Sequence, residues 1–233
     1  MSNAKLEVLS PAVTLQGYDR WSAHYDREAN PMVEATEWAL DQRPLEVAGA
    51  RVVEFGCGTG RHVPRLLAAG AQAYAGVDGS PGMLAAARAA RDPRCTWIQA
   101  TLDAVPPLGA PFDAALIVLV LEHIVDLAPV LGAAARAVRP GGVLRIVEIH
   151  PELVGGGTVA RFRDDDGVEV RFTSVAHPVD ALTAALATAG FAVERLDEPV
   201  AAGALVERVP RLAKHAGRRV LLDVTARRAG GVA

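Results

Sequence analysis

RVVEFGCGTGRHVPRLL, residues 51–67, joins a short apolar run, glycines at alternate positions and a helical pattern. An apolar run bounded by glycine is typical of a buried strand, and Gly56, Gly58 and Gly60 allow a sharp turn and close approach to a ligand. Dinucleotide-binding loops need glycine or alanine where Arg61 stands, so that the pyrophosphate reaches the helix N-terminus. The stretch therefore predicts a strand, a nucleotide-type loop and a helix, and it argues against NAD and FAD.

Strands and helices alternate along the rest of the chain, which favours βαβ units around a mostly parallel sheet. Helices are predicted at Pro31–Leu40, Arg61–Ala69, Pro81–Arg91, Leu127–Val138 and Val179–Ala189. Strands are predicted at Arg51–Phe55, Ala73–Val77, Thr96–Gln99, Phe112–Val118, Gly142–Ile149, Phe191–Leu196 and Arg219–Ala226. We expect an N-terminal helical lid over residues 1–45 and one α/β domain over residues 46–233, with an insertion at 151–177.

Composition excludes several classes of protein. The chain has 233 residues with 24 basic and 27 acidic side chains, and no Lys/Arg-rich run provides the electrostatic footprint of a nucleic-acid binder. Only Cys57 and Cys95 are present, which favours a reducing cytoplasm over a disulfide framework. The apolar run Ala114–Leu121 is too short to span a membrane, and no stretch is typical of a signal peptide. We expect a cytoplasmic protein without nucleic-acid or membrane partners.

Four segments occur in an informative order: VVEFGCGTG, GVDGSPGML, PFDAALIVLVLEHI and RPGGVLRIVEIH. Together they resemble the motifs of the class I S-adenosylmethionine-dependent methyltransferases. The resemblance implies a Rossmann-like α/β fold, a seven-stranded, mostly parallel sheet with an antiparallel last strand and helices on both faces. It also implies S-adenosyl-L-methionine as cofactor and S-adenosyl-L-homocysteine as product.

The resemblance assigns the cofactor site residue by residue. Asp78 follows the second strand, where a carboxylate can bond ribose hydroxyls; its alternative role is that of an acid at a helix N-terminus. Glu54 is placed where it can meet the cofactor ammonium, or else it is a buried acid satisfied by backbone amides. The other predicted cofactor-binding residues are Tyr18, Tyr25, Gly56, Cys57, Gly58, Gly60, Gly79, Met83, Thr101, Leu102, Asp103 and Val118.

Tyr18, Trp21 and Tyr25 recur at helical spacing before this core. Such a stripe is either a packing face or part of a lid. The pair Tyr25-Asp26 resembles the lid that closes over the cofactor in small-molecule methyltransferases, where aromatic rings would exclude water and face the sulfonium.

The insertion contains two alternating runs, Thr158–Arg163 and Gly167–Thr173, joined by three aspartates and a glycine. This pattern predicts a β-hairpin, at a place where the resembling enzymes cover their acceptor. Its charged side chains either bind an acidic acceptor or form a solvated face; they are Arg161, Arg163, Glu169 and Arg171. The aspartates lack the ligand spacing of a calcium loop, so no metal is predicted.

Three histidines are candidates for the base that deprotonates an acceptor: His123, His150 and His177. All three map to the carboxyl side of the sheet or to its loops. Each could instead be a structural residue whose hydrogen bonds are made within the protein. The overall pattern resembles bacterial ubiquinone/menaquinone-type and secondary-metabolite methyltransferases. It predicts O-, N- or C-methylation of a small organic acceptor by a monomer or homodimer. The alternative is a protein of the same fold that binds the cofactor for a non-methyl reaction or a regulatory role.

Overall fold

A seven-stranded sheet forms the centre of the computed structural model, which describes residues 6–89, 91–109 and 111–230. Its strand order is β4-β3-β2-β5-β6-β10-β9. The strands are β2 (Arg51–Phe55), β3 (Ala73–Asp78), β4 (Cys95–Gln99), β5 (Phe112–Val118), β6 (Val138–Ile149), β9 (Phe191–Asp197) and β10 (Leu221–Arg228). Pairings are parallel except for β10, which runs antiparallel to both β6 and β9. The predicted fold class is confirmed.

Helices cover both faces of the sheet because successive strand residues point to opposite sides. On β2, Val52 packs in one buried cluster and Val53 in another. The Val52 cluster includes residues of α2 (Pro31–Gln42), α3 (Val63–Ala68), α4 (Pro81–Arg88) and α8 (Gly203–Arg208). The Val53 cluster includes residues of α5 (Ala128–Ala137) and α7 (Val179–Thr188). The helix predicted at 81–91 is shorter in the structure, where α4 ends at Arg88. Residue 90 lies outside the described residues.

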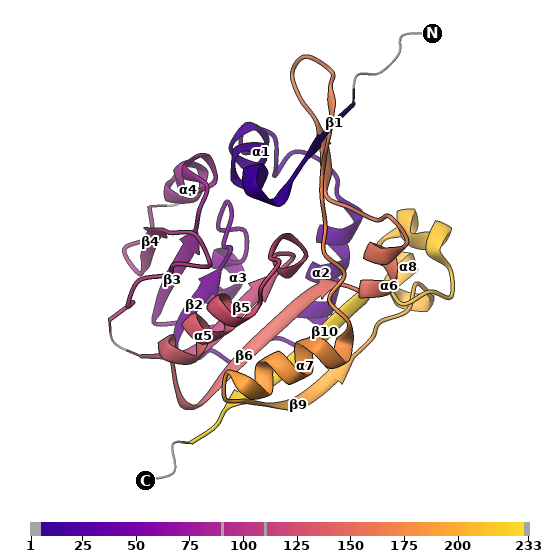
Figure 1. Cartoon of the computed structure of the whole chain (residues 1–233). Helices are drawn as coiled ribbons and strands as arrows, with labels where there is room; N and C mark the ends of the chain where they lie inside the picture. The colour runs from indigo at the N-terminus through magenta and orange to yellow at the C-terminus, as the bar shows by residue number, and fades with distance from the viewer. Residues whose placement is uncertain (1–5, 90, 110, 231–233) are drawn as a thin grey trace, which may run out of the picture.

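A second, three-stranded sheet joins two segments that are distant in sequence. Strand β1 (Leu6–Leu9) pairs in parallel with β8 (Glu169–Phe172), which pairs antiparallel with β7 (Arg161–Arg163). The hairpin prediction is thus confirmed for the insertion. We call β1, η1 (Pro11–Val13), α1 (Thr14–Trp21), β7 and β8 together the cap, which lies at the top of the molecule in Figure 1.

An aromatic core holds the cap together. Trp21 of α1 stacks on Phe162 of β7 at a centroid distance of 5.1 Å, and Tyr18 stacks on Phe172 of β8 at 4.7 Å. The cap also bonds to the main domain, because Oδ1 of Asp19 accepts hydrogen bonds from Ser80 Oγ and Gly82 N at the start of α4. Residues 6–21 of the predicted lid and the inserted hairpin therefore form one packed unit, whereas α2 packs in the core of the main domain.

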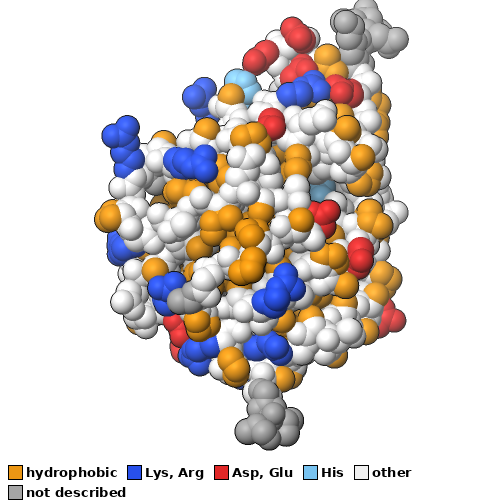
Figure 2. Space-filling view, turned by 60° about the vertical axis from the view of Figure 1, so that its left-hand side comes forward, with side chains coloured by type: hydrophobic (Ala, Val, Ile, Leu, Met, Phe, Trp, Pro, Cys, Tyr) orange, Lys and Arg blue, Asp and Glu red, His pale blue; other side chains and the backbone are white. Residues whose placement is uncertain are grey.

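Three short elements complete the fold: η2 (Leu121–His123), η3 (Pro210–His215) and α6 (Pro151–Gly155), which leads from β6 to β7 of the cap. No helix among the described residues has the length and apolar content needed to cross a bilayer. On the face shown in Figure 2, Lys and Arg side chains stand apart from one another around a central group of hydrophobic side chains. This distribution differs from the continuous basic patch expected of a nucleic-acid-binding surface.

Candidate active site

A cleft of about 560 Å³ lies at the carboxyl ends of the strands. The strand order reverses between β2 and β5, and open α/β sheets bind ligands in the crevice at such a point. The cleft is lined by the predicted residues Tyr18, Tyr25, Gly56, Gly58, Asp78, Gly79, Met83, Thr101, Leu102, Asp103 and Val118, and also by His123. We call it the cofactor cleft, after the residues that the sequence predicts to bind the cofactor.

Asp78 is held rigidly in this cleft. Its Oδ2 accepts a hydrogen bond from Gly58 N and its Oδ1 one from Ser80 N, each at 2.8 Å. Burial raises the pKa of the carboxyl, while the two backbone donors favour its charged form. A carboxylate has about four lone-pair sites, so Asp78 keeps acceptor capacity for a ligand.

The glycine loop forms a cradle that larger side chains would fill. Gly56 has φ +72°, and a Cβ there would lie 2.3 Å from Val120. Gly58 has φ +52° and open space where its side chain would be, so a ligand can approach the backbone. Two predicted residues of the loop lie outside the cofactor cleft. Gly60 lies against Trp97, and Cys57 is buried, which raises the pKa of its thiol.

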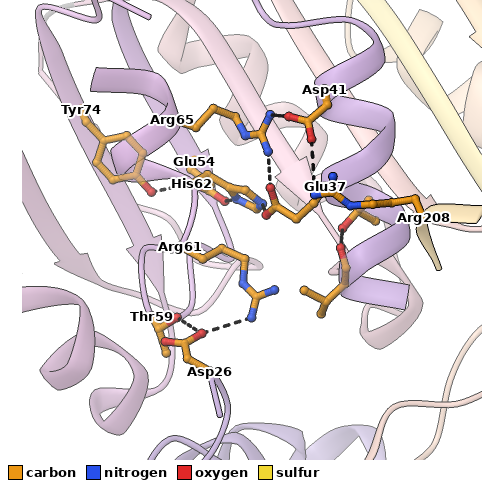
Figure 3. Close-up of polar contacts among 12 residues, drawn as sticks. Asp26, Glu37, Asp41, Glu54, Thr59, Arg61, His62, Arg65, Tyr74 and Arg208 are labelled. Carbon is orange, nitrogen blue, oxygen red and sulfur yellow. Dashed lines mark hydrogen bonds and ion pairs between the residues drawn. The ribbon is translucent and has the colours of Figure 1, made fainter. Parts of the chain in front are cut away.

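Glu54 also lies outside the cofactor cleft. It is 1% exposed; His62 Nδ1 donates to its Oε1 at 2.6 Å and Tyr74 Oη to its Oε2 at 2.5 Å. Figure 3 shows this network continuing to Glu37 of α2. Burial alone would lower the pKa of His62, but the carboxylates of Glu54 and Glu37 raise it to about 9. Glu54 thus has protein partners on both oxygens, and its contact with the cofactor ammonium stays a prediction.

The cofactor cleft meets a second cavity at Tyr18, Tyr25 and Leu119, which line both. The Tyr18 hydroxyl and Nε2 of His123 share a hydrogen bond of 2.8 Å. Burial lowers the pKa of His123 to about 4, so its imidazole is neutral near pH 7. Leu119 has φ +55°, a conformation that costs about 1–3 kcal/mol for a residue other than glycine and that clusters at ligand sites.

The second cavity has a volume of about 500 Å³ and lies between the cap, the start of α2 and η3. Glu122 lines it and is 5% exposed. Its Oε2 accepts a hydrogen bond from Ser174 Oγ at 2.8 Å, and burial raises its pKa to about 7. Sequence reasoning selected His123 and passed over Glu122, although an acid in an apolar run after a buried strand was a visible signal.

His150 and His177 line neither of these two cavities. His150 Nε2 donates to Glu198 at 2.8 Å and its Nδ1 accepts from Glu152 N at 3.2 Å, so it caps α6. His177 Nε2 donates to the carbonyl of Ile124 at 2.7 Å. The structure therefore does not bring the three histidines together, and both of these side chains have structural partners.

Comparison with known proteins agrees with this geometry. A family model described as Methyltransferase domain matches residues 52–142. A crystal structure of an S-adenosylmethionine dependent methyltransferase from Mesorhizobium loti is 29% identical, with a TM-score of 0.70 over 83% of this chain and 98% of its own. The chain contains a methyltransferase domain and has the fold of the class I S-adenosylmethionine-dependent methyltransferases. The structure of a DhpI–SAH complex is similar as well, at 25% identity and a TM-score of 0.70 over 94% of this chain and 97% of its own.

Two curated methyltransferases match the central part of the chain. A trans-aconitate 2-methyltransferase from Azoarcus sp. is 39% identical over 52% of this chain, and a ubiquinone biosynthesis O-methyltransferase from Methylocella silvestris is 32% identical over 60%. The chain spans about half the length of each, 47% and 53% respectively. The similarity therefore concerns the shared methyltransferase core. The acceptor of this protein has to be inferred from the residues of this chain.

Proposed function

We propose that this methyltransferase transfers the methyl group of S-adenosylmethionine to an O, N or C atom of a small organic acceptor, in bacterial secondary metabolism. The observation that carries the proposal is the junction at Tyr18, Tyr25 and Leu119, where the cofactor cleft meets the second cavity. Each volume lies in the range of small-molecule sites, roughly 300–1,000 Å³. We call the second cavity the acceptor cavity.

The charges of the cofactor cleft fit this cofactor. Its described lining includes Asp78, Asp103 and Asp126 and contains neither lysine nor arginine. Such a lining favours the sulfonium and ammonium of S-adenosylmethionine over the pyrophosphate of a dinucleotide. Asp78 has the free acceptor capacity that a ribose diol needs, and Gly58 leaves room beside it.

Bound S-adenosylmethionine supplies a methyl group on a positively charged sulfur. Tyr18 and Tyr25 close the junction and exclude water, which strengthens electrostatic interactions inside. Glu122 is the proposed general base, because its pKa of about 7 suits proton removal near neutral pH. His123 is a weak base with a pKa of about 4, so its role is to position Tyr18 through their hydrogen bond.

Titration calorimetry with S-adenosylmethionine, S-adenosylhomocysteine and NADH tests the cofactor. We expect both adenosyl ligands to bind and NADH to give no heat of binding. Release of S-adenosylhomocysteine during turnover then separates methyl transfer from the alternative of a non-methyl reaction, in which the cofactor is recovered unchanged. Binding of NADH alone would contradict the proposal.

Asp78→Ala should weaken S-adenosylhomocysteine binding because it removes the proposed diol acceptor. The loss of hydrogen bonds to a charged group is worth about 1.5–3 kcal/mol, which corresponds to a roughly ten- to hundredfold higher Kd. Calorimetry measures the change directly. Asp180→Ala, on an exposed residue at the start of α7, serves as the control and should leave the affinity unchanged. An equal Kd for wild type and Asp78→Ala would remove Asp78 from the site.

A further inference from the structure

The charged side chains of the acceptor cavity point to an acidic acceptor. We propose that the acceptor carries a carboxylate or phosphate group, bound by Arg161 and Lys214 with Arg211 beside them. This inference rests on the proposed function, since it assigns a ligand class to the cavity next to the cofactor cleft. Two of these cations come from η3 and one from β7, so segments far apart in sequence bring positive charge to one cavity.

The three cationic side chains have hydrogen-bond donors that no described protein group uses. The side chains of Arg161 and Lys214 are exposed and make no hydrogen bond or ion pair within the described ranges, although the charge of Arg161 acts on Glu169 through space. Arg211 Nη1 donates to the carbonyl of Ala29 at 2.6 Å, which leaves the rest of its guanidinium open. A guanidinium with free N–H groups matches the paired oxygens of a carboxylate or phosphate.

The carboxylates of the cavity make no direct ion pair with these three cations among the described residues. Glu169 pairs with Arg171 at 2.6 Å and with Arg163 at 3.6 Å. Glu28 accepts a hydrogen bond from Trp21 Nε1 at 3.2 Å. Glu122 is bonded to Ser174 and, with a pKa of about 7, is only partly charged near neutral pH. The cavity is therefore electropositive, and an anion entering it meets open donors.

The two cavities thus have opposite electrostatic character although they share Tyr18, Tyr25 and Leu119. The cofactor cleft is lined by aspartates, whereas the acceptor cavity contains arginine and lysine. The notion that the hairpin charges are only a solvated face fits Arg163 and Arg171, which pair with Glu169. Arg161 is exposed too, but it lines the cavity and makes no ion pair with a described carboxylate, so its guanidinium is open to a ligand there.

The test measures anion binding to the full chain saturated with S-adenosylhomocysteine. Citrate represents carboxylates and inorganic phosphate represents phosphates, with glycerol as an uncharged control, all at constant low ionic strength because surface charges are screened by salt. We expect one of the two anions to bind the wild type, and the identity of that anion gives the acidic group. Arg161→Ala with Lys214→Ala should weaken its binding about tenfold.

Arg136→Ala is the matched control, because Arg136 is an exposed arginine of α5 that lines neither cavity. It should bind the anion like the wild type. Unchanged anion affinity in the Arg161→Ala/Lys214→Ala variant, or binding of neither anion to the wild type, would overturn the proposal. Both outcomes apply to protein that has been shown to bind S-adenosylhomocysteine. If the wild type does not bind S-adenosylhomocysteine, the proposed function itself is refuted.

Discussion

His62→Ala is expected to lower the free energy of unfolding by about 3–5 kcal/mol, the cost of removing one partner from a buried ion pair. Glu54 would keep only its hydrogen bond from Tyr74, in a position that is 1% exposed. Glu37 would lose its contact with His62 Nε2 at 3.3 Å. Urea unfolding followed by circular dichroism measures the loss.

His24→Ala is the matched control for this variant. His24 faces Asp165 at 2.9 Å, but that carboxylate is 89% exposed, and exposed ion pairs contribute little to stability. We expect its unfolding curve to overlay that of the wild type. Equal curves for His62→Ala and the wild type would show that the buried network of Figure 3 contributes nothing.

The same network predicts a pH dependence of stability. The pKa of His62 is about 9 in the folded protein and about 6.5 in an unfolded chain. Because the folded value is the higher one, its stabilising contribution is complete below pH 6.5 and is lost as the pH rises through about 9. The wild type should therefore lose stability between pH 7 and pH 9, as measured by urea unfolding, and His62→Ala should lack this component.

Glu122→Gln is expected to reduce kcat by about 10²- to 10⁴-fold, the usual contribution of a general base. The amide keeps the shape of the side chain and can still accept the hydrogen bond from Ser174. Binding of S-adenosylhomocysteine should be unchanged, because Glu122 lines the acceptor cavity and not the cofactor cleft. Release of S-adenosylhomocysteine with an acceptor measures the rate.

The pH profile separates this role from a structural one. A base must be deprotonated to act, so wild-type kcat should rise with pH and level off above about 7, the pKa of Glu122. The Gln variant should lose this rise. Glu28→Gln, a second carboxylate of the same cavity with one hydrogen bond from Trp21, is the control and should keep the profile. A Gln variant with the wild-type rate would exclude Glu122 as the base.

Much of the fold was predictable because its signals are local. The apolar runs at Arg51–Phe55 and Phe112–Val118 coincide with β2 and β5, since a buried parallel strand needs a continuous apolar stretch. Asp78 was predictable for a related reason: it is the last residue of such a strand, and the carboxyl ends of parallel strands meet at one edge. The structure places it in the cofactor cleft with Gly58.

Other features depend on contacts between segments that sequence patterns do not connect. Glu54 has bonds from His62 and Tyr74 that no local pattern indicates, and its predicted contact with the cofactor stays a prediction. The pairing of β1 with β8, which joins residues separated by most of the chain, has no local signature. Glu122 acquires its raised pKa only from burial under the cap, a property of the surroundings and not of the residue type.

The amino-acid sequence alone was enough for the strands and the glycine loop, because each depends on residues close together in the chain, and the resemblance of four motifs gave the sheet and the cofactor class. Only the tertiary structure brought together the residues of the proposed acceptor side. There, Arg161 of β7, Glu122 of η2 and Lys214 of η3 line one cavity. Their charges act on one another and on a ligand through space, and electrostatic interactions depend on distance and burial rather than on separation along the chain.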